Sequence, residues 1–234
     1  MRRLFMLATV VVLSAGFIVA SSGIASAAKV IDNVGAPDGV SCAPVGGSLN
    51  FKVPIGNGGS YVVPTKNKGN KITISGVSVH NCVDYGQVSG TFSGTISGKI
   101  TITNPSQNPA AFYSCANLQG PIPSAGGTLK GTLKIKWSPP PGQTFSPKDS
   151  IVTFSDAFGQ TTTQGGVTYA QFAVPYTTPL GVTGAFPGAD GGASSSFNAS
   201  SANGLGSILA QCGTAGGVSS LMLSPSLLGG LFLN

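Results

Sequence analysis

The chain has 234 residues, of which only 8% are charged, and its 12 Lys and Arg against 6 acidic residues give a formal net charge of +6. The two arginines stand at positions 2 and 3 and the lysines are scattered, which argues against a nucleic-acid-binding protein. Low charge with abundant glycine is also typical of low-complexity sequence, but regular alternation of apolar and polar residues argues against disorder.

The N-terminal 27 residues are typical of a secretory signal peptide. Two arginines precede the apolar stretch 4–20, and residues 25–27 form a small-residue cleavage site, Ala-Ser-Ala. We therefore expect an exported protein whose residues 28–234 form a single all-β domain, with no transmembrane span in the mature chain. An uncleaved N-terminal membrane anchor is the alternative interpretation of this stretch.

Short strands separated by turn residues are expected before position 80. Apolar residues alternate with polar ones, or cluster briefly, at 48–53, 61–63 and 71–79. Glycine-rich and proline-containing segments at 56–59 and 64–70 predict the turns between these strands.

The stretch from Gly86 to Thr103 has the clearest pattern, a four-residue Gly-x-apolar-x repeat with strict alternation of two faces. The pattern returns at 127–134, so the two stretches are expected to be neighbours in one sheet. A single strand over all of 86–103 would exceed the usual strand length. We therefore expect the chain to bend at a glycine or to turn back near Ser97-Gly98. The glycines should leave room for aromatic rings; the candidates are Phe112, Tyr113 and Trp137.

The second half of the chain continues the pattern of short strands. Strands are expected at 111–115, 128–137, 150–155, 167–174, 180–186 and 218–223, and a short helix at 200–211. Many short strands without a long helical period predict an all-β fold: an antiparallel sandwich or barrel, with Greek-key or jelly-roll-like connections and one short C-terminal helix.

Four cysteines, Cys42, Cys82, Cys115 and Cys212, predict two disulfides in an exported chain. Three pairings are possible, and we expect Cys82–Cys115 with Cys42–Cys212. A zinc site is the rival interpretation, but the chain has no Cys-x-x-Cys motif and only one histidine. We therefore expect neither a metal nor another cofactor.

The order of these motifs resembles that of a group of small secreted proteins of high-GC Gram-positive bacteria. The alternating strand leads into Ser114-Cys115, a Gly-Thr-Leu-Lys-Ile-Lys-Trp motif ends at Trp137, and Cys212 is followed by a Gly-Gly pair and a final apolar strand. The resemblance implies export and a disulfide-bonded β fold, and it assigns no catalytic residue.

Candidate catalytic groups are few. His80 with Ser78 or a distant serine, and Asp84 as the orienting acid, would form a hydrolytic triad, but the chain has no Gly-x-Ser-x-Gly motif. Asp149 and Asp156 bracket an expected strand and could act as paired carboxylates on a sugar, although aspartates at strand ends more often form turns. We therefore expect a protein that is not an enzyme.

Binding is better supported by the sequence. Ser89, Thr91, Ser93 and Thr95 predict a flat row of hydroxyls on one face of a sheet, suited to a polysaccharide or to ordered water, although a plain solvated face has the same pattern. Stacking platforms could come from five aromatic residues: Tyr61, Phe112, Tyr113, Tyr169 and Tyr176.

The C-terminal tail, residues 224–234, is apolar and uncharged. Leu227, Leu228, Leu231 and Phe232 could contact lipid or a partner chain, while the alternative is a segment folded back over the core.

These features together predict a secreted, disulfide-stabilised, non-catalytic β-domain protein of the extracellular space or the cell envelope. The expected partner is a cell-wall glycan, a lipid or a second copy of the chain, and not a nucleic acid. The alternatives are a secreted hydrolase that uses His80 and a structural protein that associates with itself.

Overall fold

The computed structural model of the chain describes residues 28–32, 39–43, 45–57, 59–62, 70–84, 86–103, 113–118, 128–154, 158–174, 181–187, 196–224 and 230–233. The predicted signal peptide lies outside these residues. The strands are β1 (Lys29–Asp32), β2 (Val40–Cys42), β3 (Val45–Ile55), β4 (Asn70–Asp84), β5 (Phe92–Thr103), β6 (Thr128–Ser138), β7 (Gln143–Ser146), β8 (Asp149–Phe154), β9 (Phe158–Gln164), β10 (Val167–Val174), β11 (Gly181–Gly184), β12 (Ser196–Gly204), β13 (Val218–Leu223) and β14 (Gly230–Leu233). The helices are a 3₁₀ turn, η1 (Cys115–Leu118), and one α-helix, α2 (Leu205–Cys212).

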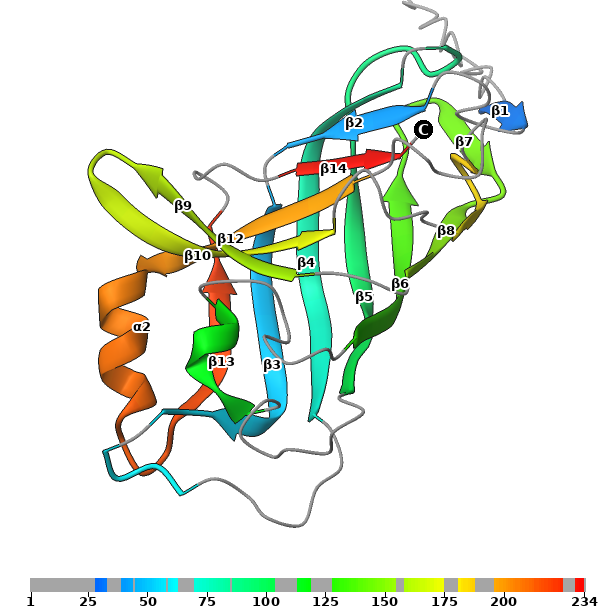
Figure 1. Cartoon of the computed structure of the whole chain (residues 1–234). Coiled ribbons are helices and arrows are strands. Elements are labelled where there is room, and N and C mark those ends of the chain that lie inside the picture. Colours follow the sequence, from blue (N-terminus) through cyan, green and yellow to red (C-terminus); the bar gives the residue numbers. More distant parts are fainter. Residues whose placement is uncertain are drawn as a thin grey trace, which may run out of the picture.

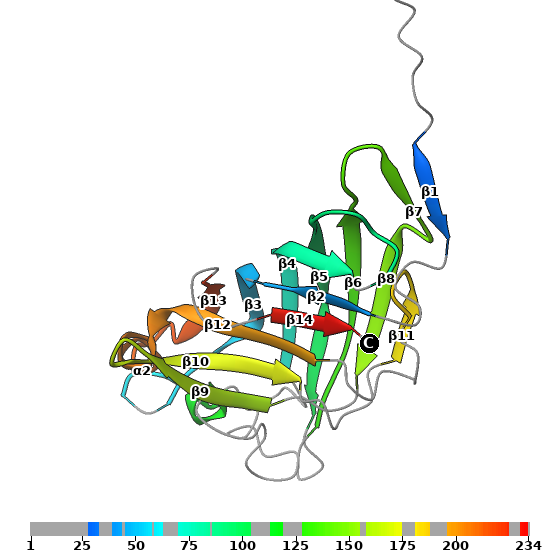
Figure 2. The same ribbon diagram turned by 90° about the horizontal axis from the view of Figure 1, so that it is seen from above.

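The strands form two layers that cross steeply (Figures 1 and 2). One layer has the order β11-β8-β6-β5-β4, continued by β3 and β13, and the other has the order β2-β14-β12-β10-β9. The layers are joined because the long strand β4 pairs with both β3 and β2, and because β12 pairs with β13. All of these pairings are antiparallel, while β1 pairs with β7 in a separate parallel pair. The predicted all-β fold with one short helix is confirmed.

The central glycine repeat forms one strand and one bend. β5 begins at Phe92, and Gly90, with φ of 89°, breaks the extended conformation before it. Of the two predicted alternatives, the bend at a glycine is found at Gly90, and the turn back near Ser97-Gly98 is not, since both residues lie within β5. The expected pairing of the two repeat stretches is confirmed, because β5 and β6 pair from Ser93↔Ser138 to Thr103↔Thr128.

Buried side chains of the two layers form a single core cluster. Its centre under β5 and β6 is a group of four aromatic rings, Phe92, Trp137, Phe145 and Phe186, with ring centroids 5.0–5.7 Å apart in the closest pairs. The Trp137 Nε1–H donates a 2.8 Å hydrogen bond to the Ser150 hydroxyl, which in turn donates to the Ala185 carbonyl. The prediction that a glycine makes room for Trp137 is confirmed, because a Cβ on Gly94 would lie 2.9 Å from that ring.

Several predicted elements differ from the observed ones. Residues 61 and 62 lie in no strand, Cys115 begins a 3₁₀ turn, and 200–204 belongs to β12 rather than to the helix. Ser200 and Ser201 are buried in the β12 pairings, and the helix begins only after them, at Leu205.

The disulfides are Cys42–Cys82 and Cys115–Cys212, so the expected pairing was wrong. Cys42 and Cys82 lie on the neighbouring strands β2 and β4, whose pairing at Ser41↔Val83 brings the two Cα atoms to 4.0 Å. Cys115 and Cys212 instead join the start of η1 to the last residue of α2. The sequence did not show that β2 returns to β4.

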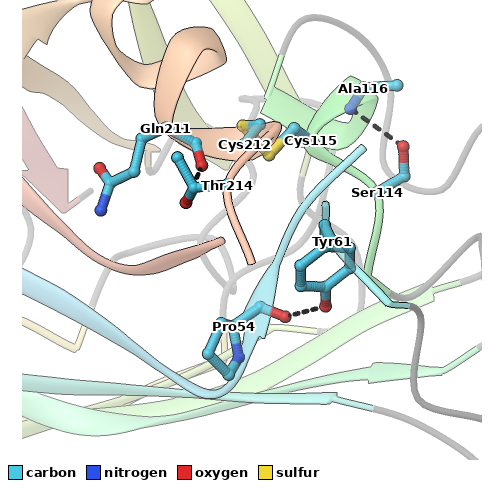
Figure 3. The surroundings of a disulfide bond; sticks show 8 residues. All are labelled: Pro54, Tyr61, Ser114, Cys115, Ala116, Gln211, Cys212 and Thr214. Atoms are coloured by element: carbon cyan, nitrogen blue, oxygen red, sulfur yellow. Dashed lines mark hydrogen bonds between the residues drawn. A yellow bond between two sulfur atoms is a disulfide. The ribbon is translucent and has the colours of Figure 1, made fainter. Parts of the chain in front are cut away.

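The second disulfide lies in a junction of four segments (Figure 3). Backbone N–H groups of Gly56, Asn57 and Ser60 donate to the carbonyls of Tyr113, Cys212 and Gly213 at 2.7–3.0 Å. The Tyr61 ring lies against the backbone of Gly56 and Gly217, and its hydroxyl donates a 2.5 Å hydrogen bond to the Pro54 carbonyl. Desolvation by burial, followed by repulsion from Tyr113, raises the pKa of Tyr61 above its usual value of 10.0.

Replacing Tyr61 with Phe should cost about 1 kcal/mol of unfolding free energy at neutral pH, because the Pro54 carbonyl loses its donor. The raised pKa also predicts a pH dependence. The folded state favours the neutral phenol, so the stability that this group contributes is complete below pH 10 and is lost as the pH rises through the folded-state pKa. The wild-type chain should therefore lose stability more steeply than Tyr61→Phe above pH 10, in urea unfolding at pH 7, 9 and 11. Tyr169→Phe on β10 is the control, and equal slopes for the wild type and Tyr61→Phe would contradict the prediction.

Candidate functional site

The predicted hydroxyl row is divided between a strand and the bend before it. Ser93 and Thr95 lie on β5 with their side chains on the side away from the core, whereas Ser89 and Thr91 lie exposed in the preceding segment. The Ser89 carbonyl accepts a 2.8 Å hydrogen bond from the Gln143 side chain, which fixes the bend beside β7. The four hydroxyl residues therefore do not form one straight row.

The polar face of β5 instead continues sideways over β4 and β6, which lie on either side of it (Figure 1). Alternation buries the apolar residues of these strands and exposes the residues between them. We call nine of these exposed residues the hydroxyl–lysine face; they are Lys71, Thr73, Thr95, Ser97, Lys99, Lys130, Thr132, Lys134 and Lys136.

Strand register arranges these side chains in rows across the sheet. Lys99 lies opposite Thr73 on β4 and Thr132 on β6. In the same way Ser97 lies opposite Lys134, and Thr95 lies opposite Lys136. Within β4, β5 and β6, no lysine is directly opposite another lysine. Each ammonium group therefore has a hydroxyl as its cross-strand neighbour.

One ion pair is found on this face within the described residues. Lys134 Nζ lies 2.7 Å from Asp149 Oδ2 of β8, and both side chains remain partly exposed. Surface pairs of this kind contribute little to stability. The other four lysines of the face have no carboxylate within ion-pair distance in the described part of the chain. The face is therefore positively charged and rich in hydroxyls.

A hollow of about 330 Å³ adjoins the face where β6 ends. Lys136, Lys148 and Asp149 lie at its rim, and Trp137 and Phe145 lie beneath. Both rings are at least 95% buried, so they form a floor rather than a stacking platform.

The predicted aromatic platforms do not belong to this face. Tyr61 lies in the disulfide junction, Tyr113 is fully buried and Tyr169 is half-buried on β10. Phe112 and Tyr176 lie outside the described residues.

The structure brings together two of the three residues of the candidate triad. His80 Nε2 lies 3.0 Å from Ser78 Oγ on the exposed side of β4. Asp84 is buried, because a bulge at Asn81, with φ of 50°, shifts the alternation of the strand. Its Oδ2 accepts hydrogen bonds of 2.6 and 2.8 Å from the backbone N–H groups of Gln87 and Val88. Asp84 therefore holds the bend before β5 and does not orient His80.

The remaining candidates lie apart from one another. Asp149 is paired with Lys134, and Asp156 lies outside the described residues. The described residues include no cluster of three or more metal-ligating side chains. No helix in the described part of the chain has the length and apolarity that a bilayer crossing requires.

The C-terminal tail enters the middle of the second layer. β14 lies between β2 and β12, with Leu231 and Leu233 buried and Phe232 half-buried. Leu231 is therefore part of the core and is not available as an exposed contact. Leu227 and Leu228 lie outside the described residues.

Comparison of the chain with protein-family models, with curated proteins and with solved structures gives no match.

The sequence alone did not indicate the lysines as site residues. The exposure of Lys130, Lys134 and Lys136 followed from the alternation of β6, but their approach to the hydroxyls of β5 depends on the strand register. The returning glycine repeat at 127–134, which predicted that β5 and β6 are neighbours, was the signal that could have found them.

Proposed function

We propose that this protein is an exported, non-catalytic β-domain protein that binds a glycan of the cell envelope through the hydroxyl–lysine face. The observation that carries the proposal is the continuous polar surface over β4, β5 and β6, where Thr73, Thr95 and Thr132 stand exposed among lysines. Hydroxyls donate and accept hydrogen bonds, so such a surface can match the hydroxyls of a sugar chain.

Export is supported by the signal-like N-terminus and by two disulfides, which persist in oxidising compartments. A lipid ligand is less well supported, since the face has no exposed large apolar side chain among its members. Among the exposed large hydrophobic residues, Met222 lies on β13 and Val167 on β10, while Val83 lies on β4 itself, beyond the bulge at Asn81 and in the end of the strand that pairs with β2.

The proposal is tested by replacing Thr73, Thr95 and Thr132 together with Val. Valine keeps the shape and is favoured in strands, so the fold should persist while three hydroxyls are lost. Retention on purified, insoluble cell-wall glycan should weaken by about tenfold or more, since each net hydrogen bond contributes about 0.5–1.5 kcal/mol.

The matched control replaces three exposed threonines of the other layer, Thr161, Thr163 and Thr168 on β9 and β10, with Val. This control should be retained like the wild type. Equal retention of the wild type and the Thr73, Thr95, Thr132 variant would refute glycan binding by this face.

A further inference from the structure

We propose, on the basis of the proposed function, that the glycan bound by the hydroxyl–lysine face is an acidic polysaccharide, held by lysines of three adjacent strands. The chain has ten lysines, and five of them, Lys71, Lys99, Lys130, Lys134 and Lys136, lie exposed on β4, β5 and β6. A chain with so few charges gathers half of its lysines on one face, which is not the even distribution expected of lysines that only aid solubility.

Lys99 is the centre of this arrangement. Its direct neighbours are Thr73 and Thr132, so its diagonal neighbours are Lys71 on β4 and Lys130 and Lys134 on β6. Diagonal neighbours in an antiparallel sheet lie about 7–8 Å apart at the backbone. Four ammonium groups on flexible stems therefore surround one strip of sheet and can reach a chain that carries acidic groups at intervals.

The charge of the face is not cancelled within the described residues. Asp149 neutralises Lys134 at 2.7 Å, which leaves four of the five lysines without a carboxylate partner there. On the neighbouring strand β3, Lys52 is also exposed, two residues beyond Asn50, which lies opposite Thr73. A neutral glycan would leave these ammonium groups unused, whereas an acidic one would pair with them.

Other anionic partners fit the face less well. A single-stranded nucleic acid is usually bound by stacking on aromatic residues, and the face has none. An anionic membrane is usually bound by lysines together with apolar side chains that enter the lipid, and the face presents threonine and serine between its lysines instead. Alternating ammonium and hydroxyl groups match a polymer that is both charged and polyhydroxylated.

The test measures binding of the disulfide-bonded protein to polygalacturonate and to fully methyl-esterified polygalacturonate, which has the same backbone without the charge. Calorimetry at several salt concentrations should show binding to the acid form, at least tenfold weaker binding to the ester, and affinity that falls with salt. The double variant Lys99→Gln with Lys130→Gln should bind the acid form at least tenfold more weakly than the wild type and with a shallower salt dependence.

The charge-matched control is the single variant Lys29→Gln, compared with the single variant Lys99→Gln; Lys29 is exposed on β1 and lies off the three strands. The Lys29→Gln variant should bind like the wild type. The opposing result is that the wild type binds the acid and ester forms equally, with binding to both lost in the Thr73, Thr95, Thr132 variant. That result would overturn the acidic specificity and leave the proposed glycan function standing. If the protein bound neither polymer, or bound phosphatidylglycerol vesicles more strongly than polygalacturonate, the inference would be overturned. The proposed function is tested separately, by retention on cell-wall glycan.

Discussion

Loss of the Cys115–Cys212 disulfide should lower the free energy of unfolding by about 4–5 kcal/mol. The bond joins residues 97 positions apart, and a cross-link over so long a loop removes much of the freedom of the unfolded chain. In the folded state it holds η1 against the end of α2 (Figure 3). At the same junction the backbone N–H groups of Gly56 and Asn57 donate to the carbonyls of Tyr113 and Cys212. The double variant Cys115→Ala with Cys212→Ala tests this in urea unfolding.

The double variant Cys42→Ala with Cys82→Ala is the comparison. The Cys42–Cys82 bond joins residues only 40 positions apart, so its removal should lower the free energy of unfolding by about 4 kcal/mol. The backbone pairing of β2 with β4 also remains in place to hold the two strands together. We therefore expect the Cys115–Cys212 variant to be the less stable of the two. The opposite order, or a loss below about 1 kcal/mol for Cys115–Cys212, would contradict this account.

The disulfide pairing shows where prediction from sequence ended. The number of cysteines predicted two bonds, but the pairing depends on which strands become neighbours. Cys42 meets Cys82 because β2 crosses to the far end of β4, beyond the bulge at Asn81. Nothing in the local pattern of residues 39–43 indicates that crossing.

Strands with strict alternation were predictable, because one buried and one exposed face leave a period of two in the sequence. β5 and β6 are of this kind. β14 was not predicted as a strand, since a short apolar segment such as 230–233 has no period, and its place between β2 and β12 depends on distant partners. β9 was not predicted as a strand either. Its sequence, Phe-Gly-Gln-Thr-Thr-Thr-Gln, has only one large apolar residue and therefore shows no alternation.

In the candidate site, too, features that follow from alternation were predictable and features that depend on strand pairing were not. Thr95 was expected on an exposed face from alternation within β5, and it lies there. The positions of Lys99 and Lys134 relative to the hydroxyls follow only from register, because a shift of one residue would turn one of the two strands over. Ser89 is separated from Thr91, Ser93 and Thr95 because Gly90, with φ of 89°, bends the chain between them, and alternation alone does not indicate this bend.

Gly98→Ala should cost about 3 kcal/mol of unfolding free energy, near the upper end of what overpacking costs. Gly98 lies in the middle of β5, opposite Ile74 on one side and Leu133 on the other. A Cβ there would lie 2.3 Å from the Thr132 carbonyl oxygen and 3.0 Å from the Leu133 Cα. Both are backbone atoms of a paired strand, so they cannot move aside without disturbing the β5–β6 pairing.

Two further glycine variants separate this clash from a general effect of alanine. Gly94→Ala meets only side chains, the Trp137 ring at 2.9 Å and the Ile135 side chain at 3.1 Å, and no backbone atom as close as the one at Gly98, so it should cost less than Gly98→Ala. Gly206→Ala lies on α2 in open space and should stabilise the protein by up to about 1 kcal/mol, because alanine favours the helix. Urea unfolding of the three variants checks the order. If Gly98→Ala were as stable as the wild type, β5 and β6 could not pair in the observed register. The rows of lysines and hydroxyls across these two strands depend on that register, so they would be refuted as well.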